Sequence, residues 1–287
     1  MTETLFCVLH IPKCAGSTIE GHLHKSLGSN AFWKPQKRTR RFPLELLGRK
    51  YDRRLPGPAE SVRAISGHFI GTSIEQYFPG RAIKRVILLR RPADLLLSWY
   101  NFRMMRYIAS GLAPYAFNLH LRSMSPDPVA HFLLERWLEL PLWKILSMST
   151  ETKAKLLDQT LSTFEFIGDI GDCDRLIGTI SRELQIEQVA ERANTEGGWR
   201  NRVTWNPLRY ANLTDEYRSM IAELTALDEY LWRRWALNEN VSFDAKCSER
   251  QLIAHGLRRP YYELHRRYRR AWLNYNQAEW EMGSRKL

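Results

Sequence analysis

The sequence has few cysteines, and they form no recognisable site. The four cysteines are widely scattered and include no CxxC pair: Cys7, Cys14, Cys173 and Cys247. This distribution fits neither a zinc site nor the disulfide framework of a small secreted domain. We therefore expect reduced thiols and a cytoplasmic protein.

Long apolar runs are also missing. No segment approaches the roughly 18 consecutive apolar residues of a membrane-spanning helix. The first apolar run begins at Leu5, so there is no room for a signal peptide before it. We expect a soluble protein without an N-terminal membrane anchor.

Acidic residues are outnumbered: 31 Asp and Glu stand against 43 Lys and Arg, which gives a formal net charge of +12. Such a balance indicates anionic partners, whether a nucleotide, an acidic glycan, nucleic acid or an anionic membrane surface. With 287 residues, of which 44% are hydrophobic, the chain can build one large α/β domain or two small ones. Charge alone does not choose among these partners.

The most informative stretch is residues 5–27, where the hydrophobic period changes. Residues 5–11 are an apolar run of strand length, whereas Ile19, Leu23 and Leu27 recur at helical spacing. The connection between them, PKCAGST, is made of small residues with one lysine. The start of a helix presents unpaired N–H groups and a partial positive charge, so this turn suits a phosphate or sulfate group.

Within this turn, Ser17 and Thr18 add hydroxyl groups and Lys13 adds a full charge. The turn is not a nucleotide-binding P-loop, because Lys13 precedes Gly16 by three positions and no glycine comes before it. We therefore do not expect a standard ATP or GTP loop. Taken alone, an ordinary strand-turn-helix with a solvated lysine remains the alternative.

A second strand is predicted over residues 62–69 (VRAISGHF), and it ends in Gly67 and His68. A histidine at the end of a strand is well placed to act as a general base, and the preceding glycine lets other groups approach. Many histidines in such positions are merely structural. His68 is the candidate base.

The clearest strand is residues 85–90 (RVILLR), whose central residues are all apolar, as in a buried parallel strand. Pro92 then opens a helix. Arg90 is thus expected at the carboxyl end of a strand and Ser98 about two turns along the helix, near the crevice where open α/β sheets bind ligands. The alternative for Arg90 is an ordinary surface ion pair.

These motifs resemble those of carbohydrate sulfotransferases that use 3′-phosphoadenosine 5′-phosphosulfate (PAPS). Residues 10–18 (HIPKCAGST) resemble the family's 5′-phosphosulfate loop, with Cys14 in place of the usual threonine. Arg90 followed eight residues later by Ser98 resembles the 3′-phosphate site, with Arg91 in place of the usual aspartate. The segment around His68 is similar to the catalytic histidine region of the 2-O-sulfotransferase branch, and the chain looks like a bacterial member.

The resemblance implies an α/β fold with a central parallel sheet flanked by helices, the P-loop-NTPase-like sulfotransferase fold. It implies transfer of a sulfuryl group from PAPS to a hydroxyl of a carbohydrate or glycoconjugate, without a metal, leaving adenosine 3′,5′-bisphosphate. Lys13 and His68 would be catalytic. The donor would be bound by Lys13, Ala15, Gly16, Ser17, Thr18, Arg90 and Ser98.

The rest of the chain carries weaker signals. Residues 33–54 are a basic surface excursion that could clamp an acidic acceptor, and residues 194–206 form a possible closing loop with two tryptophans and two arginines. A strand over 163–168 and helices over 127–140, 172–184 and 214–235 complete the predicted domain. We divide the chain into a sulfotransferase domain, residues 1–250, and a basic aromatic helical extension, residues 251–287.

Several alternatives stay open. The C-terminal helix could lie peripherally on an anionic membrane or simply pack on the domain. The acceptor is expected to be a carbohydrate or glycolipid, possibly anionic, and no specific nucleic acid is expected. A P-loop-like small-molecule kinase and a basic nucleic-acid-binding protein are the alternative functions; the first should need magnesium with a nearby carboxylate, the second a strong salt dependence.

Overall fold

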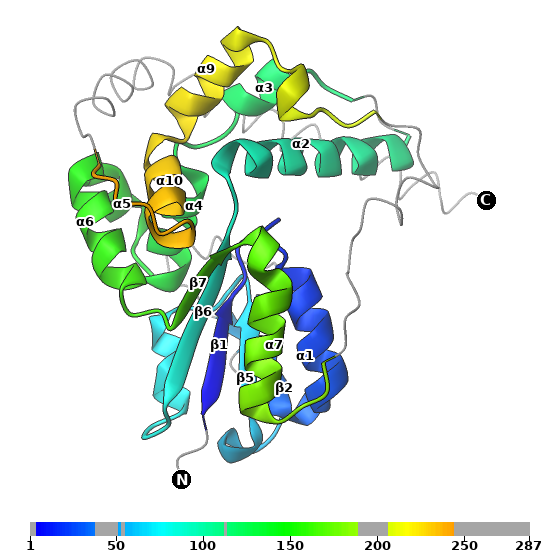
Figure 1. The fold of residues 1–287 in the computed structure, drawn as a ribbon, viewed down its shortest axis with the longest axis vertical. Coiled ribbons are helices and arrows are strands. Elements are labelled where there is room, and N and C mark those ends of the chain that lie inside the picture. The colour runs from blue at the N-terminus through cyan, green and yellow to red at the C-terminus, as the bar shows by residue number, and fades with distance from the viewer. Residues whose placement is uncertain (1–3, 38–50, 53–54, 112–113, 189–205, 244–287) are drawn as a thin grey trace.

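A parallel sheet forms the centre of the molecule. The computed structural model describes residues 4–37, 51–52, 55–111, 114–188 and 206–243. Its main sheet has five strands, all parallel, in the order β2-β5-β1-β6-β7 (Figure 1). These strands are β1 (Leu5–Leu9), β2 (Phe32–Trp33), β5 (Ala64–Gly67), β6 (Ile83–Leu89) and β7 (Phe166–Asp169). The short strands β3 (Gln36–Lys37) and β4 (Tyr51–Asp52) form a separate antiparallel pair.

Both faces of the sheet are buried, which explains why β1 is apolar at every position. Leu5, Cys7 and Leu9 belong to one core cluster, and Phe6 and Val8 belong to the other. Helices α1 (Gly16–Ala31) and α7 (Cys173–Leu184) cover the face of Phe6 and Val8. The opposite face packs against α4 (Pro128–Phe132), the π-helical turn η3 (Leu133–Trp137), α5 (Leu142–Ser147), α6 (Thr150–Leu161) and α10 (Ala226–Leu231).

A third group of helices lies across the carboxyl ends of the strands. Helix α2 (Pro92–Ala109) runs above the sheet in Figure 1 and packs with α3 (Phe117–Arg122) and α9 (Asp215–Leu224). The side chain of Asn101 on α2 exchanges two hydrogen bonds with the backbone of Leu208, at 2.9 and 3.0 Å. Helix α2 therefore lies above the carboxyl ends of β1, β5 and β6, where the loops that follow these strands begin (Figure 1).

Two aspartates, the buried Asp228 and the half-buried Asp127, join α4 to α10. The Asp228 carboxylate accepts hydrogen bonds from the backbone N–H groups of Val129 (2.9 Å) and Ala130 (2.7 Å). In return, the Asp127 carboxylate accepts from the N–H groups of Leu227 (2.8 Å) and Asp228 (3.3 Å). Burial raises the pKa of Asp127 to about 6, although these N–H donors favour its charged form. Each helix start is therefore capped by the other segment, which fixes α4 in place.

The sequence predictions of the main elements are confirmed with shifted ends. The strand predicted over 163–168 is Phe166–Asp169, and the helix predicted over 214–235 is interrupted at Thr225, between α9 and α10. Trp33 was assigned to a surface excursion, but it is buried in the edge strand β2. The boundary between residues 250 and 251 and the predicted C-terminal helix lie outside the described residues. No helix in the described ranges is long and apolar enough to cross a membrane.

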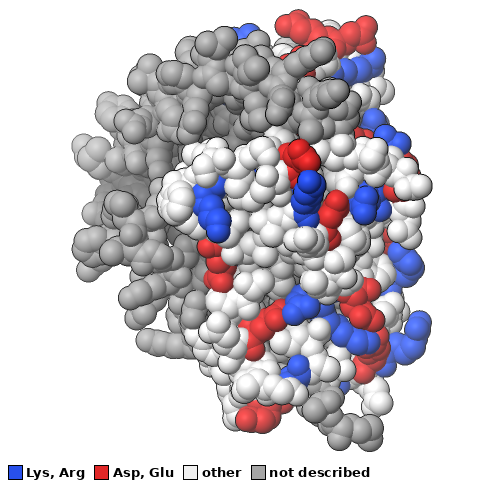
Figure 2. All heavy atoms as spheres, turned by 90° about the vertical axis from the view of Figure 1, so that its left-hand side faces the viewer, with Lys and Arg blue, Asp and Glu red and all other residues white. Residues whose placement is uncertain are grey.

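The surface seen in Figure 2 does not carry a single sign of charge over its described part. Basic and acidic side chains alternate there, in contrast with the net charge of +12 of the whole chain. Among the described residues, ion pairs join Lys84 to Glu183 and Arg85 to Glu75, both at 2.6 Å.

Candidate functional site

The turn between β1 and α1 has the backbone of an anion-binding loop. Lys13 and Ala15 adopt left-handed conformations, with φ of 71° and 57°. Ala15 is the N-cap residue of α1, and no side chain caps the helix there. The first amides of α1 therefore lack acceptors within the helix, where the partial positive charge of the helix also lies. Loops with left-handed residues often form such concave groups of N–H donors.

Gly16 is required at this turn for a reason that the sequence does not reveal. A Cβ atom built on Gly16 would overlap the imidazole ring of His10. The His10 ring is buried and lies directly against the start of α1. The sequence analysis placed Gly16 among the small residues of the turn, and the structure adds that it makes room for His10.

Replacing Gly16 by alanine should therefore disrupt the loop. We expect a loss of about 1 to 3 kcal/mol in the free energy of unfolding, because the new methyl group has to displace a packed ring. The matched control is Gly21→Ala on the same helix, where a Cβ meets nothing within 4 Å. That control should stabilise the protein by up to about 1 kcal/mol. Urea unfolding of both variants measures the contrast, and equal effects would contradict this role of Gly16.

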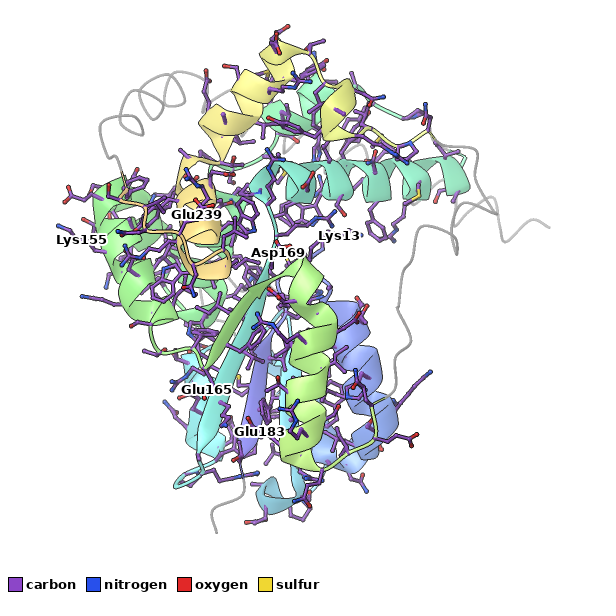
Figure 3. All side chains as sticks on the ribbon, viewed as in Figure 1. Lys13, Lys155, Glu165, Asp169, Glu183 and Glu239 are labelled. Atoms are coloured by element: carbon purple, nitrogen blue, oxygen red, sulfur yellow. The ribbon has the colours of Figure 1, made fainter. Side chains whose placement is uncertain are left out.

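Two cations meet at the loop, although they come from distant parts of the chain. Arg90, which follows β6, donates from Nη1 to the backbone carbonyl of Lys13 at 3.2 Å. The Lys13 ammonium lies 4.2 Å from the ring centroid of Phe102 on α2, so Lys13 sits between the sheet and α2 (Figure 3). Burial and the nearby Arg90 charge lower the pKa of Lys13.

Neither Lys13 nor Arg90 forms an ion pair with a carboxylate in the part of the chain that the structure describes. The Nε atom of Arg90 is buried without a hydrogen-bond partner there. The carboxylate of Asp169 lies near the loop in Figure 3 but accepts hydrogen bonds from Trp232 Nε1 (2.8 Å) and the Gly171 N–H (3.1 Å). Two adjacent cations without a counter-charge favour the binding of an anion.

The other predicted donor residues surround the same loop. Ser17 and Thr18 are half-buried in the first turn of α1. Ser98 is half-buried on α2, one turn before Phe102, and therefore on the helix face that contacts Lys13. Arg91, which stands where the resembling family has aspartate, lies over the ring of Tyr210 at 4.6 Å.

His68 lies beside the loop in the form that a general base needs. Its Nδ1–H donates to the backbone carbonyl of His10 at 2.7 Å, which leaves the lone pair of Nε2 free to accept a proton. Burial and the neighbouring His10 lower the pKa of His68. At neutral pH the imidazole is therefore uncharged, and a neutral imidazole can remove a proton.

A pocket of about 420 Å³ opens next to His68. It extends from the loop to α4 and η3, and it has aromatic, hydroxyl and charged walls. Its lining includes Pro12, His68, Phe69, Ser125, His131, Phe132, Glu135 and Arg136. Burial, together with the charge of Lys153, lowers the pKa of His131 to about 4, so this histidine is neutral as well. The pocket has the size of sites that hold small ligands.

Sequence reasoning assigned no chemistry to the helix that lines this pocket. The spacing of His131 and Glu135, four residues apart, was the available signal, since it places both on one face of a helix. The π-helical turn at Leu133–Trp137 could not be read from the sequence. Cys14 is excluded as a nucleophile, because burial raises the pKa of its thiol to about 12.

The structure thus brings Arg90 to the backbone of Lys13, with Ser17 and Thr18 in the first turn of α1. Separately, it holds His68 against His10, the residue that follows β1. The tryptophans and arginines of the predicted closing loop, at positions 199–205, lie outside the described residues. No protein-family model matches the chain, and no curated protein matches it significantly.

Proposed function

We propose that the protein is a PAPS-dependent sulfotransferase that acts on a hydroxyl group of a carbohydrate or glycoconjugate. The observation that carries this proposal is the contact between the anion loop and the base. The ring of His10 packs against Gly16, and its centroid lies 3.9 Å from the ring centroid of His68. A group held by the loop is therefore close to a base that can activate an attacking hydroxyl.

The residues of the loop fit an anionic donor. Within the described residues, Lys13 and Arg90 form no ion pair with a carboxylate, and the Nε of Arg90 is buried without a partner. Together with the uncapped start of α1, they favour a negatively charged ligand. Strands β1, β5 and β6 are neighbours in the sheet, and each delivers one part of the site just after its carboxyl end. Ligands of open parallel sheets bind at this edge, which supports the proposed fold and site.

PAPS supplies the sulfuryl group together with a phosphate leaving group. Nε2 of His68 would accept the proton of the attacking hydroxyl as the new bond to sulfur forms. Lys13 and the amides at the start of α1 would stabilise the negative charge that develops on the departing phosphate oxygen. Arg90 and Ser98 would hold the 3′-phosphate, as expected from the resemblance.

The pocket beside His68 suits the acceptor. The rings of Phe69 and Phe132 offer flat apolar surfaces for the face of a sugar. Glu135 and Ser125 provide acceptors and donors for hydroxyl groups. A hydroxyl bound there lies between the neutral imidazole of His68 and the loop that carries Pro12.

Titration of the protein with adenosine 3′,5′-bisphosphate and with ATP plus magnesium, by calorimetry, tests the donor site. We expect metal-independent binding of the bisphosphate, weakened about 10- to 150-fold in Arg90→Ala, because a charge-assisted hydrogen bond contributes about 1.5 to 3 kcal/mol. The control Arg175→Ala removes an exposed arginine on α7 and should not change binding.

The other outcomes of the titration separate the alternatives. Preference for ATP with magnesium would reject the sulfotransferase and favour a kinase. Binding of neither ligand would reject the donor site altogether. If the bisphosphate binds, transfer of ³⁵S from labelled PAPS to a panel of neutral and acidic glycans identifies the acceptor.

A further inference from the structure

The candidate base is held by a buried polar network that the proposed mechanism does not use. Nδ1 of His10 donates to Oε1 of Glu20 at 2.8 Å. The Glu20 carboxylate also accepts from Lys34 Nζ at 2.6 Å and from Ser66 Oγ at 3.2 Å. Both His10 and Glu20 are buried, with 4% and 6% of their surface exposed.

The network joins separate elements around one point. His10 follows β1, Glu20 lies on α1, Lys34 follows β2 and Ser66 lies on β5, next to Gly67 and His68. Its centre is the ring of His10, which fills the space above Gly16 and contacts the ring of His68. The carbonyl of His10 also receives the Nδ1–H of His68.

We propose that Glu20 and His10 are positioning residues. They hold His68 in its reactive tautomer and keep its imidazole in a fixed position relative to the anion loop. Glu20 fixes the orientation of the His10 ring, and His10 then fixes both the start of α1 and the imidazole of His68. The catalytic meaning of this arrangement rests on the proposed function, but the arrangement itself does not.

The alternative is that Glu20 and His10 only stabilise the fold. The two roles can be separated by experiment, because the charge of Glu20 also acts on His68. Replacing a buried ion pair by residues of similar volume is often neutral for stability. Burial alone would raise the pKa of Glu20, but the hydrogen bonds from His10 and Lys34 outweigh burial and hold this pKa at about 2. Glu20 is therefore a permanent negative charge close to the base.

That charge acts on His68 in a known direction. Burial and the neighbouring His10 lower the pKa of His68, the charge of Glu20 raises it, and that of Lys34 lowers it. The other charged or titratable groups at the pocket wall are His131, Glu135 and Arg136. Removing the charge of Glu20 should thus lower the pKa of His68, and removing the charge of Lys34 should raise it.

The experiment is NMR titration of the histidine rings in the full chain, with the signals of His68 assigned by their loss in His68→Ala. In Glu20→Gln, which keeps a hydrogen-bond acceptor for His10, the midpoint of His68 should fall by at least about 0.5 pH unit. In Lys34→Gln it should rise, by less, because Lys34 is 46% exposed in its side chain. Unchanged midpoints in both variants would overturn the proposal.

Two further measurements separate positioning from folding and from the proposed function. Glu20→Gln should bind adenosine 3′,5′-bisphosphate within about twofold of wild type, and the acid limb of its kcat/KM profile should move with the titration of His68. Loss of bisphosphate binding without a shift of His68 would show a structural role and overturn the proposal. If His68 shifts as expected but wild type binds no bisphosphate, the positioning stands and the sulfotransferase proposal fails.

Discussion

Replacing His68 by alanine is expected to lower kcat by a factor of about 10² to 10⁴, the usual contribution of a general base. Binding of adenosine 3′,5′-bisphosphate should stay unchanged, because His68 faces the pocket while its Nδ1–H is bound by the carbonyl of His10. Loss of turnover without loss of donor binding is the result that separates a base from a donor ligand. Steady-state kinetics with the identified acceptor, combined with calorimetry, measures both.

The pH dependence of the proposed activity of the wild-type protein provides an independent check on His68. Burial lowers its pKa below the ordinary value of 6.5, and the base works in its neutral form. The profile of kcat/KM should therefore be flat around pH 7 and fall on the acid side only below pH 6.5. A base with an ordinary or raised pKa would instead lose activity already between pH 7 and 6.

His24→Ala is the matched control for this prediction. His24 is exposed on α1, where its ring meets Phe32 edge-on at 6.4 Å between centroids. The same substitution there should leave both kcat and the acid limb unchanged. Turnover of His68→Ala at the wild-type rate would rule out His68 as the base and would direct attention to Glu135, the carboxylate in the same pocket.

The strands and loops that carry the proposed donor site could be predicted because their signals are local. A strand buried on both faces needs apolar residues at consecutive positions, and β1 and β6 show such runs in the sequence. The proline at the start of α2 and the small residues before α1 then mark where each helix begins. The positions of Lys13, Arg90 and Ser98 in the fold could therefore be predicted from the sequence.

The pocket beside His68, the proposed acceptor site, could not be predicted, because its walls come from distant segments. Pro12, His68 and Glu135 are brought together only by the packing of α4 and η3 against the sheet. The position of α4 in turn depends on the reciprocal capping by Asp127 and Asp228, which are about 100 residues apart and have no shared sequence motif. Such contacts between distant segments leave no periodic signal.

The network around Glu20 escaped prediction for a related reason. In the sequence, Glu20 reads as an exposed polar position between Ile19 and Leu23 on an amphipathic helix. In the structure it is buried, because His10, Lys34 and Ser66 satisfy its oxygens. A charged residue at a buried helix position requires partners from other elements, and those partners are set by the tertiary fold.

Replacing Lys13 by glycine is expected to lower kcat by a factor of about 10² to 10³ while leaving the protein slightly more stable. The loss of rate follows from removing the mobile charge at the loop. The gain in stability follows from three features of Lys13: its left-handed backbone costs about 1 to 2 kcal/mol in a residue with a side chain, its ammonium is largely buried, and it lies beside the charge of Arg90.

We expect these stabilising effects of Lys13→Gly to exceed the stabilising contributions that the substitution removes. The contact of the ammonium with the ring of Phe102 contributes about 0.5 to 1 kcal/mol, and the added freedom of glycine in the unfolded chain costs a similar amount. Because the lowered pKa of Lys13 means that its charged form disfavours the folded state at pH 7, the balance is a rise of up to about 1 kcal/mol in the free energy of unfolding. Urea unfolding measures this change.

Ala15→Gly is the matched control, because it relieves the same kind of backbone strain two residues away without removing a charge. Ala15 also has a left-handed conformation, with φ of 57°. The control should keep its activity and be at least as stable as wild type, within about 1 kcal/mol. We therefore expect Lys13→Gly to lower kcat and raise the free energy of unfolding, and Ala15→Gly to lower neither. This contrast is expected if the backbone strain and the buried charge of Lys13 are retained for function. A joint loss of stability and rate in Lys13→Gly would instead make Lys13 a structural residue, and the anion site would have to rest on Arg90 and the amides of α1.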